Sequence, residues 1–110
     1  MAVPVVVLVT FPSMEVARNV SNTLVGEGMA ACVNLLPGGE SVYRWKGKVE
    51  VTNEVVALVK TTRSSLEGLE RLYTRLHPYE VPEFLVLDAV NGSQAYLEWL
   101  LGSVAESRGH

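Results

Sequence analysis

The sequence lacks the marks of several large classes of protein. Its Lys and Arg residues are scattered rather than grouped in basic blocks, and the net charge is -3. The attraction to phosphate that drives nucleic-acid binding therefore has little to act on. No apolar run approaches the roughly 20 residues that a membrane-spanning helix needs. The apolar N-terminal stretch has no basic residues before it and contains a proline, which is untypical of a secretory signal. We therefore expect a soluble protein that binds neither nucleic acid nor membrane.

Cysteine is almost absent, and the common catalytic motifs are missing. Cys32 is the single cysteine. It cannot form an internal disulfide, and a lone thiol is common in the reducing cytosol, so the cytoplasm is the expected location. The chain has no CxxC pair, no GxxxxGK or GxGxxG motif, and no Ser or Cys nucleophile with a recognisable base. We expect a protein that is not an enzyme.

Apolar residues are plentiful instead. The 110 residues are 48% hydrophobic and 19% charged, which is enough for a packed core. A second independent core is not expected at this length. We therefore treat 1–110 as a single domain, with 106–110 as a frayed tail.

The first quarter of the chain predicts a strand followed by a helix. Val5–Val9 is a continuous β-branched and aliphatic run, typical of a central strand buried on both faces. Ser13 follows a proline and can cap a helix with apolar residues at helical spacing. Gly26 or Gly28 is expected to end that helix.

The next segment predicts a long hairpin. Met29–Trp45 reads as extended, with a bulge or bend at Pro37-Gly38-Gly39. Lys46-Gly47 is expected to form a two-residue turn, because Gly47 can adopt the positive φ that such a turn requires. This register places Trp45 opposite Lys48 and Tyr43 opposite Glu50.

The remaining elements complete an α+β fold. Ser64–Glu67 is interpreted as a capping box that starts a second helix, which Pro78 stops. Phe84–Val90 is expected to be a fourth strand, and Asn91-Gly92-Ser93 to cap a final helix. The order predicts a ferredoxin-like βαββαβ sandwich with an appended C-terminal helix.

The hairpin is too long for the body that carries it. Each arm has roughly 12 to 15 residues, or about 40 to 50 Å, whereas a globule of this length is only about 35 Å across. A protruding ribbon would expose apolar side chains and strand edges, which other copies of the chain could cover in a closed ring. A monomer whose hairpin bends back at Pro37 is the alternative. The apolar ribbon residues are Val42, Tyr43, Trp45, Val49 and Val51.

The stretch HPYEVPE, from His77 to Glu83, is the strongest candidate site. His77 is either a helix-capping donor or a metal ligand with Glu80 and Glu83. Tyr79 belongs to a loop stiffened by prolines, with its ring packed and its hydroxyl paired. Glu83 could accept hydrogen bonds from neighbouring backbone, pair with a basic residue such as Lys60, or take part in acid-base chemistry.

Two further segments could carry a site. Cys32 is either a small buried apolar residue or a functional thiol. Lys60-Thr61-Thr62-Arg63 precedes a helix N-terminus and could hold an anion, or it is a solvated strand end.

These residues together resemble the CutA family of divalent-cation tolerance proteins, along nearly the whole chain. The matching motifs are Val6 to Thr10 with Pro12, Ala30-Ala31-Cys32-Val33-Asn34, Tyr43-Arg44-Trp45-Lys46-Gly47-Lys48, Glu54, Lys60-Thr61-Thr62, His77-Pro78-Tyr79-Glu80-Val81-Pro82-Glu83 and Tyr96-Leu97-Glu98-Trp99.

The resemblance implies a homotrimer like that of the PII signalling proteins, with a role in the response to divalent metal ions. Copper binding in some members uses a thiol in the first strand and a histidine pair, where this chain has Val9 and Leu76 and retains His77. By the same resemblance, Cys32, His77, Tyr79 and Glu83 would lie near a cleft between subunits, where PII-like trimers bind small ligands.

The function expected from the resemblance is weak binding of copper or another divalent cation. The candidate metal residues are His77, Cys32 and Glu83, and the candidate cleft residues are Tyr79, Lys60 and Arg63. The alternatives are a sensor of a small anionic ligand, a purely structural trimer, and an acid-base enzyme that uses His77 and Glu83.

Overall fold

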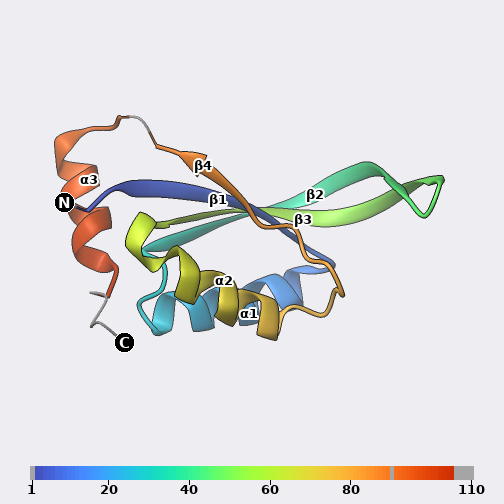
Figure 1. The fold of residues 1–110 in the computed structure, drawn as a ribbon, viewed down its shortest axis with the longest axis horizontal. Helices are drawn as coiled ribbons and strands as arrows, with labels where there is room; N and C mark the ends of the chain where they lie inside the picture. Colours follow the sequence, from blue (N-terminus) through green and yellow to red (C-terminus); the bar gives the residue numbers. More distant parts are fainter. Residues whose placement is uncertain (1, 90, 106–110) are drawn as a thin grey trace.

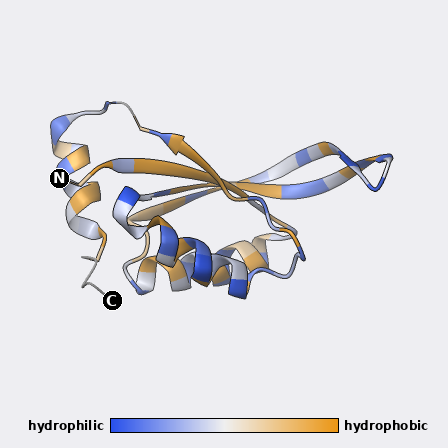
Figure 2. Ribbon diagram, in the orientation of Figure 1, coloured by the Kyte–Doolittle hydropathy of each residue, from blue (hydrophilic) through white to orange (hydrophobic). Residues whose placement is uncertain are grey.

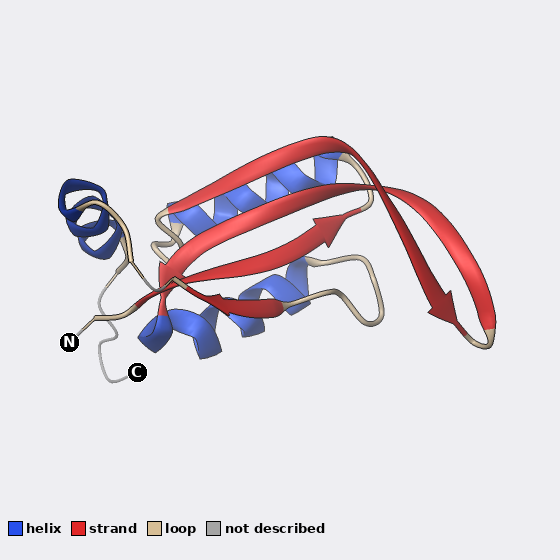
Figure 3. Cartoon of the chain, turned by 90° about the horizontal axis from the view of Figure 1, so that it is seen from above, coloured by secondary structure: helices blue, strands red, loops and turns tan. Residues whose placement is uncertain are grey.

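Four antiparallel strands form one sheet, in the order β2-β3-β1-β4. The computed structural model describes residues 2–89 and 91–105. The elements run β1 (Pro4–Phe11), α1 (Met14–Gly26), β2 (Cys32–Trp45), β3 (Lys48–Thr62), the short 3-10 turn η1 (Arg63–Ser65), α2 (Leu66–Leu76), β4 (Leu85–Asp88) and α3 (Gln94–Ser103). Helices α1 and α2 lie side by side on one face of the sheet, and α3 lies at the end near the N-terminus (Figures 1 and 3). The predicted ferredoxin-like plan is confirmed.

The core lies between the sheet and the two helices on its face. Val5, Val7 and Val9 of β1 are fully buried, and their neighbours Val6 and Leu8 are only half-buried. The central position of β1, between β3 and β4, is therefore confirmed, but burial on both faces is not. The reason is that α1 and α2 cover one face, so alternate residues meet different surroundings.

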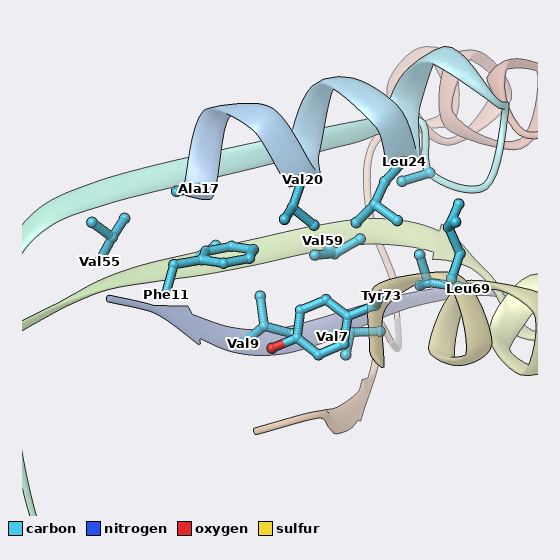
Figure 4. Packing of buried hydrophobic residues seen from close by; sticks show 13 residues of the cluster. Val7, Val9, Phe11, Ala17, Val20, Leu24, Val55, Val59, Leu69 and Tyr73 are labelled. Atoms are coloured by element: carbon cyan, nitrogen blue, oxygen red, sulfur yellow. The ribbon is translucent and has the colours of Figure 1, made fainter. Parts of the chain in front are cut away.

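Side chains of the sheet and of both covering helices meet in this core (Figure 4). The buried cluster joins β1, β3, α1 and α2. It comprises Val7, Val9, Phe11, Ala17, Val20, Leu24, Ala30, Val55, Ala57, Val59, Leu69, Leu72 and Tyr73. Figure 2 shows that β1 and β4 are mostly hydrophobic and that hydrophobic and hydrophilic residues alternate along α1 and α2.

Helix α1 begins and ends where its sequence predicts. The Ser13 hydroxyl accepts a hydrogen bond from the Val16 N–H at 3.2 Å, so it is the N-cap. The last helical residue is Gly26, and Gly28 has φ of +74°, a conformation that favours glycine at a helix end.

The start of α2 differs from the prediction. Ser65 precedes the helix in an αR conformation, and its side chain makes no capping hydrogen bond. Thr62 Oγ1 instead lies 3.3 Å from Ser64 Oγ and 3.1 Å from Ser65 Oγ. The capping box is wrong because the 3-10 turn η1 already continues the chain into the helix, whereas a capping residue needs extended backbone. The predicted stop is confirmed, since His77 is extended before Pro78.

The hairpin has the predicted register. Trp45 pairs with Lys48, Tyr43 pairs with Glu50, and the register shifts between Leu36 and Gly39. The turn residues Lys46 and Gly47 have φ of 51° and 81°, which is typical of a type I′ turn. The strands are 14 and 15 residues long, and the tip of the ribbon projects beyond the helices (Figure 1). The molecule is 44 Å along its longest axis.

The C-terminal part is shorter than predicted. Strand β4 covers Leu85–Asp88 rather than Phe84–Val90, and Val90 and 106–110 lie outside the described residues. The Ser93 hydroxyl caps α3 by accepting from the Tyr96 N–H, as predicted. Within residues 2–89 and 91–105, no helix is long and apolar enough to cross a membrane.

We expect Gly39→Ala to destabilise the protein by about 1–3 kcal/mol, the usual range for overpacking. A Cβ at Gly39 would lie 2.8 Å from the Glu54 carbonyl oxygen and 3.1 Å from Val56 Cγ2. Urea denaturation followed by circular dichroism measures the change. The control is Gly26→Ala, where a Cβ would meet nothing within 4 Å. Equal effects of the two substitutions would show that the bulge tolerates a side chain.

Candidate functional site

A hollow of about 680 Å³ lies where the protruding ribbon leaves the body of the protein. The loop between α2 and β4 forms one wall, and the ribbon forms the other. The lining residues are Thr10, Ser41, Val42, Tyr43, Trp45, Thr52, Glu54, Tyr79, Glu80, Val81 and Glu83. We call this space the ribbon hollow.

Glu54 occupies the floor of the ribbon hollow. Alternate residues of β3 face the helices, so Val55 enters the core and Glu54 points to the other face of the sheet. Glu54 is only 9% exposed, and its Oε2 accepts a hydrogen bond of 2.8 Å from the Tyr79 hydroxyl. Burial, followed by this hydrogen bond, raises the pKa of Tyr79 to about 12. Tyr79 therefore stays protonated at neutral pH and donates to Glu54.

His77 anchors the start of the loop. Its side chain is buried, with Nε2 at 2.7 Å from the Thr10 carbonyl oxygen. Its Nδ1 accepts a hydrogen bond of 3.1 Å from the Tyr79 N–H. Because Nδ1 is an acceptor, the proton lies on Nε2, which donates to Thr10. The ring also stacks on Phe11 at a centroid distance of 5.4 Å.

His77 acts as a hydrogen-bond donor, as the structural alternative in the sequence analysis expected, but its acceptor is not the one expected. The side chain bonds to a carbonyl of β1 and not to the end of its own helix. Both ring nitrogens are used, so copper could bind His77 only after one of these hydrogen bonds had broken. The side chain therefore does not fit a metal site in this arrangement.

Tyr73 anchors the end of the loop. Its hydroxyl donates a hydrogen bond of 2.7 Å to the Glu83 carbonyl oxygen, and burial raises the pKa of this fully buried tyrosine above its usual value. The Glu83 carboxyl group lies at the rim of the hollow. Partial burial and then the neighbouring charge of Glu54 raise the pKa of Glu83. The two carboxylates therefore repel each other across the hollow.

The other predicted site residues lie at the far end of the sheet. Cys32 pairs with Lys60 in the sheet, and Lys60 Nζ donates a hydrogen bond of 3.0 Å to the Tyr96 hydroxyl. That hydrogen bond raises the pKa of Lys60. Arg63 forms an ion pair with Asp88. Lys60 lies six positions beyond Glu54 along β3, a distance of about 20 Å.

The predicted residues thus divide into two groups within one chain. Tyr79 and Glu83 line the ribbon hollow, with His77 beneath them, whereas Cys32, Lys60 and Arg63 do not contribute to it. The suggested pairing of Glu83 with Lys60 is wrong, because Lys60 bonds to Tyr96. Among the residues that the structure describes, no three His, Cys, Asp or Glu side chains come together as a group that could hold a metal ion.

The sequence analysis missed Glu54 as a site residue. The usable signal was a charged residue in a strand that continues into a buried apolar run, from Val55 to Val59. The approach of Tyr79 to Glu54 could not be read from the sequence, because 25 positions separate them.

The chemistry of the ribbon hollow is that of a site for positive charge. Its lining carries three carboxylates, from Glu54, Glu80 and Glu83, and no Lys, Arg or His of the described chain. Two aromatic residues of the ribbon, Tyr43 and Trp45, line the same hollow, and Lys46 Nζ lies 6.0 Å from the centre of the Trp45 ring. Such a surface attracts cations and repels anions.

We expect NMR of 15N-labelled protein to show His77 with its proton on Nε2 and none on Nδ1. The substitution His77→Gln should lower the free energy of unfolding by about 1–3 kcal/mol, because buried partners lose their hydrogen bonds. Urea denaturation measures this loss, with the exposed Glu70→Gln on α2 as the control. A proton on Nδ1 would contradict the assigned hydrogen bond from Tyr79.

Known proteins resemble this chain over nearly its whole length. The family model for the CutA1 divalent ion tolerance protein matches residues 5–103. The divalent-cation tolerance protein CutA of Thermus thermophilus is 48% identical over 95 residues, which cover 86% of this chain and 92% of the relative. The chloroplastic protein CutA of Arabidopsis thaliana is 46% identical over 99 residues, which cover 90% of this chain and 54% of the relative, so the chain spans about half of that protein. The crystal structure of CutA1 from Oryza sativa aligns with a TM-score of 0.92 at 42% identity, covering 96% of this chain and 98% of that chain. The family expected from the sequence motifs is thus confirmed, and this chain belongs to the CutA1 divalent ion tolerance family.

Proposed function

We propose that this protein serves in divalent-cation tolerance as a non-enzymatic homotrimer that binds divalent cations weakly. Its family membership supports the role in tolerance. The main support for assembly is the apolar face of the sheet on the side opposite α1 and α2. We call this surface the open face. The cytoplasm stays the predicted location, although the Arabidopsis relative is named as chloroplastic.

The open face carries rows of apolar side chains. Leu58, Leu8 and Leu85 are direct neighbours across three strands. Leu85 and Leu87 of β4 are 54% and 43% exposed. An apolar surface that runs across several strands is unusual on a monomer and is typical of an interface.

The ribbon extends the same surface beyond the body of the protein. Val42 and Val51 face each other in the hairpin and are 65% and 59% exposed. Strand β2 is one of the two outer strands of the sheet, so among the described residues one side of its backbone has no partner strand. Contacts between copies would cover both the apolar side chains and this edge. A closed ring of three copies satisfies every such edge by rotational symmetry.

We expect a mass of about 36 kDa in solution, three times the 12.0 kDa of one chain. Multi-angle light scattering at micromolar concentration measures it. The substitution Leu87→Asp should shift the mass toward one chain, because it places a charge in the apolar interface.

Val25→Asp is the matched control for this experiment. Val25 is 41% exposed, close to the 43% of Leu87, but lies on α1 away from the open face. It should leave the mass unchanged. A stable 12 kDa particle of the unmodified protein would contradict the proposed assembly.

The carboxylates of the ribbon hollow support weak binding of divalent cations. Of the candidate metal residues, Glu83 is accessible, whereas His77 is closed by two hydrogen bonds and Cys32 lies at the other end of the sheet. A cation held by one or two carboxylates keeps most of its water ligands, so its binding is weak. The same carboxylates argue against the alternative of a small anionic ligand in this hollow.

We expect calorimetric titration with copper and zinc chlorides to show weak binding that Glu83→Gln reduces several-fold. Cys32→Ser is the control and should leave the titration unchanged, because Cys32 is remote from the hollow. No heat with either metal, or loss of binding in Cys32→Ser alone, would contradict the use of Glu83.

A further inference from the structure

Glu54 is a buried carboxylate that has no positive partner among the described residues of its own chain. It is 9% exposed, and the hydrogen bond to its carboxylate comes from the neutral Tyr79 hydroxyl. The ion pairs in residues 2–89 and 91–105 are Arg63–Asp88 and Arg71–Glu67, so neither includes it. Removing a carboxylate from water is costly unless a positive charge compensates it. The floor of the ribbon hollow is therefore suited to a cation that comes from outside this chain.

The far end of the ribbon carries a cluster of positive charge. Arg44, Lys46 and Lys48 lie within five consecutive residues around the hairpin turn, and all three side chains are exposed. None of them forms an ion pair within the part of the chain that the structure describes. We call these three residues the basic tip. The other basic residues in the described ranges lie on α1, on α2 or at the opposite end of the sheet: Arg18, Lys60, Arg63, Arg71 and Arg75.

The basic tip cannot reach Glu54 of its own chain. Lys48 lies six positions before Glu54 along β3, a distance of about 20 Å. An ion pair needs its nitrogen and oxygen within about 4 Å. The strand pairing is unbroken from Trp45 and Lys48 back to Gly39 and Glu54, which holds the ribbon extended over this length. The acidic and basic surfaces therefore lie at opposite ends of one element, and only two copies of the chain can bring them together.

A contact between two different surfaces of the same chain is head-to-tail. Such a contact closes into a ring or continues as a filament. In a ring of three, every copy inserts one tip and receives one, so all three hollows are filled. The ribbon residues Val42, Tyr43 and Trp45 line the hollow as well. The charged contact and the apolar contact between copies would thus be parts of one continuous interface.

We propose that the basic tip of one copy enters the ribbon hollow of the next copy and supplies the positive charge that pairs with Glu54. The inference rests on the proposed homotrimer and adds which surfaces meet in it. The apolar lining covers the long stems of the incoming Lys and Arg side chains. A buried ion pair of this kind fixes the register and orientation of the partners. Glu83, exposed at the rim, is left for the proposed metal contact.

Disulfide trapping tests whether tip and hollow meet. The variant carries Lys46→Cys in the basic tip and Glu80→Cys at the exposed rim, together with Cys32→Ser to remove the native thiol. Mild oxidation of the assembled protein should give three linked chains on a denaturing gel without reductant. Replacing Glu80→Cys by Glu70→Cys, at an exposed position on α2, is the control and should leave single chains.

A double-mutant cycle tests whether the tip acts on Glu54. Sedimentation velocity over a dilution series, in urea that half-dissociates the unmodified protein, measures the concentration at which the assembly dissociates. Glu54→Gln keeps an acceptor for Tyr79, and both it and the exposed tip variant Arg44→Gln/Lys46→Gln/Lys48→Gln should raise that concentration. Combined, they should differ from additivity by about threefold or more, because each removes the same pair. The tip variant combined with Glu40→Gln, a ribbon residue outside the hollow lining, should be additive.

Several results would overturn the proposal. Single chains after oxidation of the Lys46→Cys/Glu80→Cys variant, in a protein of about 36 kDa, would remove this contact and leave the homotrimer standing. Linked chains from Lys46→Cys alone would show that the tips meet one another and not the hollow. Additivity of the tip variant with Glu54→Gln would show that the two charges do not interact. A mass of one chain for the unmodified protein would remove both the homotrimer and this contact.

Discussion

The structure depends on a sheet that two long helices cover on one face only. Along β1 and β3, one set of alternate residues packs against α1 and α2, and the other set faces away from them. This alternation decides which residues form the core and which remain open to a partner. It also allows Glu54 to be charged, because the residue lies beside core residues in sequence but on the opposite face of the sheet. A second layer of helices would have required an apolar residue at that position.

The ribbon hollow exists because the loop from His77 to Glu83 is fixed at both ends. His77 bonds to a carbonyl group of β1, and Tyr73 bonds to the carbonyl group of Glu83. Both anchors are hydrogen bonds from buried side chains to the backbone. They fix the path of the loop independently of the side chains between them. Side chains between the anchors, such as Tyr79, can therefore line the hollow.

The fold could be predicted in detail wherever local chemistry determines it. The pairing of Trp45 with Lys48 followed from the turn residues alone, since a two-residue turn fixes the register of the whole hairpin. The predicted capping box at Ser64–Glu67 is wrong because the 3-10 turn η1 places Ser65 in an αR conformation, in which its side chain makes no capping hydrogen bond. In the candidate site, the residue types were predictable but their partners were not. His77 and Thr10 are 67 positions apart, and no pattern in a single sequence relates them.

The positions of the candidate ligands determine what kind of cation chemistry the chain can support. Imidazole and thiolate groups bind soft and borderline metals tightly, but His77 is enclosed by its hydrogen bonds and Cys32 lies beside Lys60. The groups that remain accessible together are carboxylates and aromatic rings. Carboxylates and aromatic rings attract cations through charge and polarisability rather than through strong coordinate bonds. The strength of this attraction therefore increases as the site excludes water. Glu54 is the most buried of the three carboxylates that line the hollow, and its hydrogen-bond partner is the neutral Tyr79 hydroxyl.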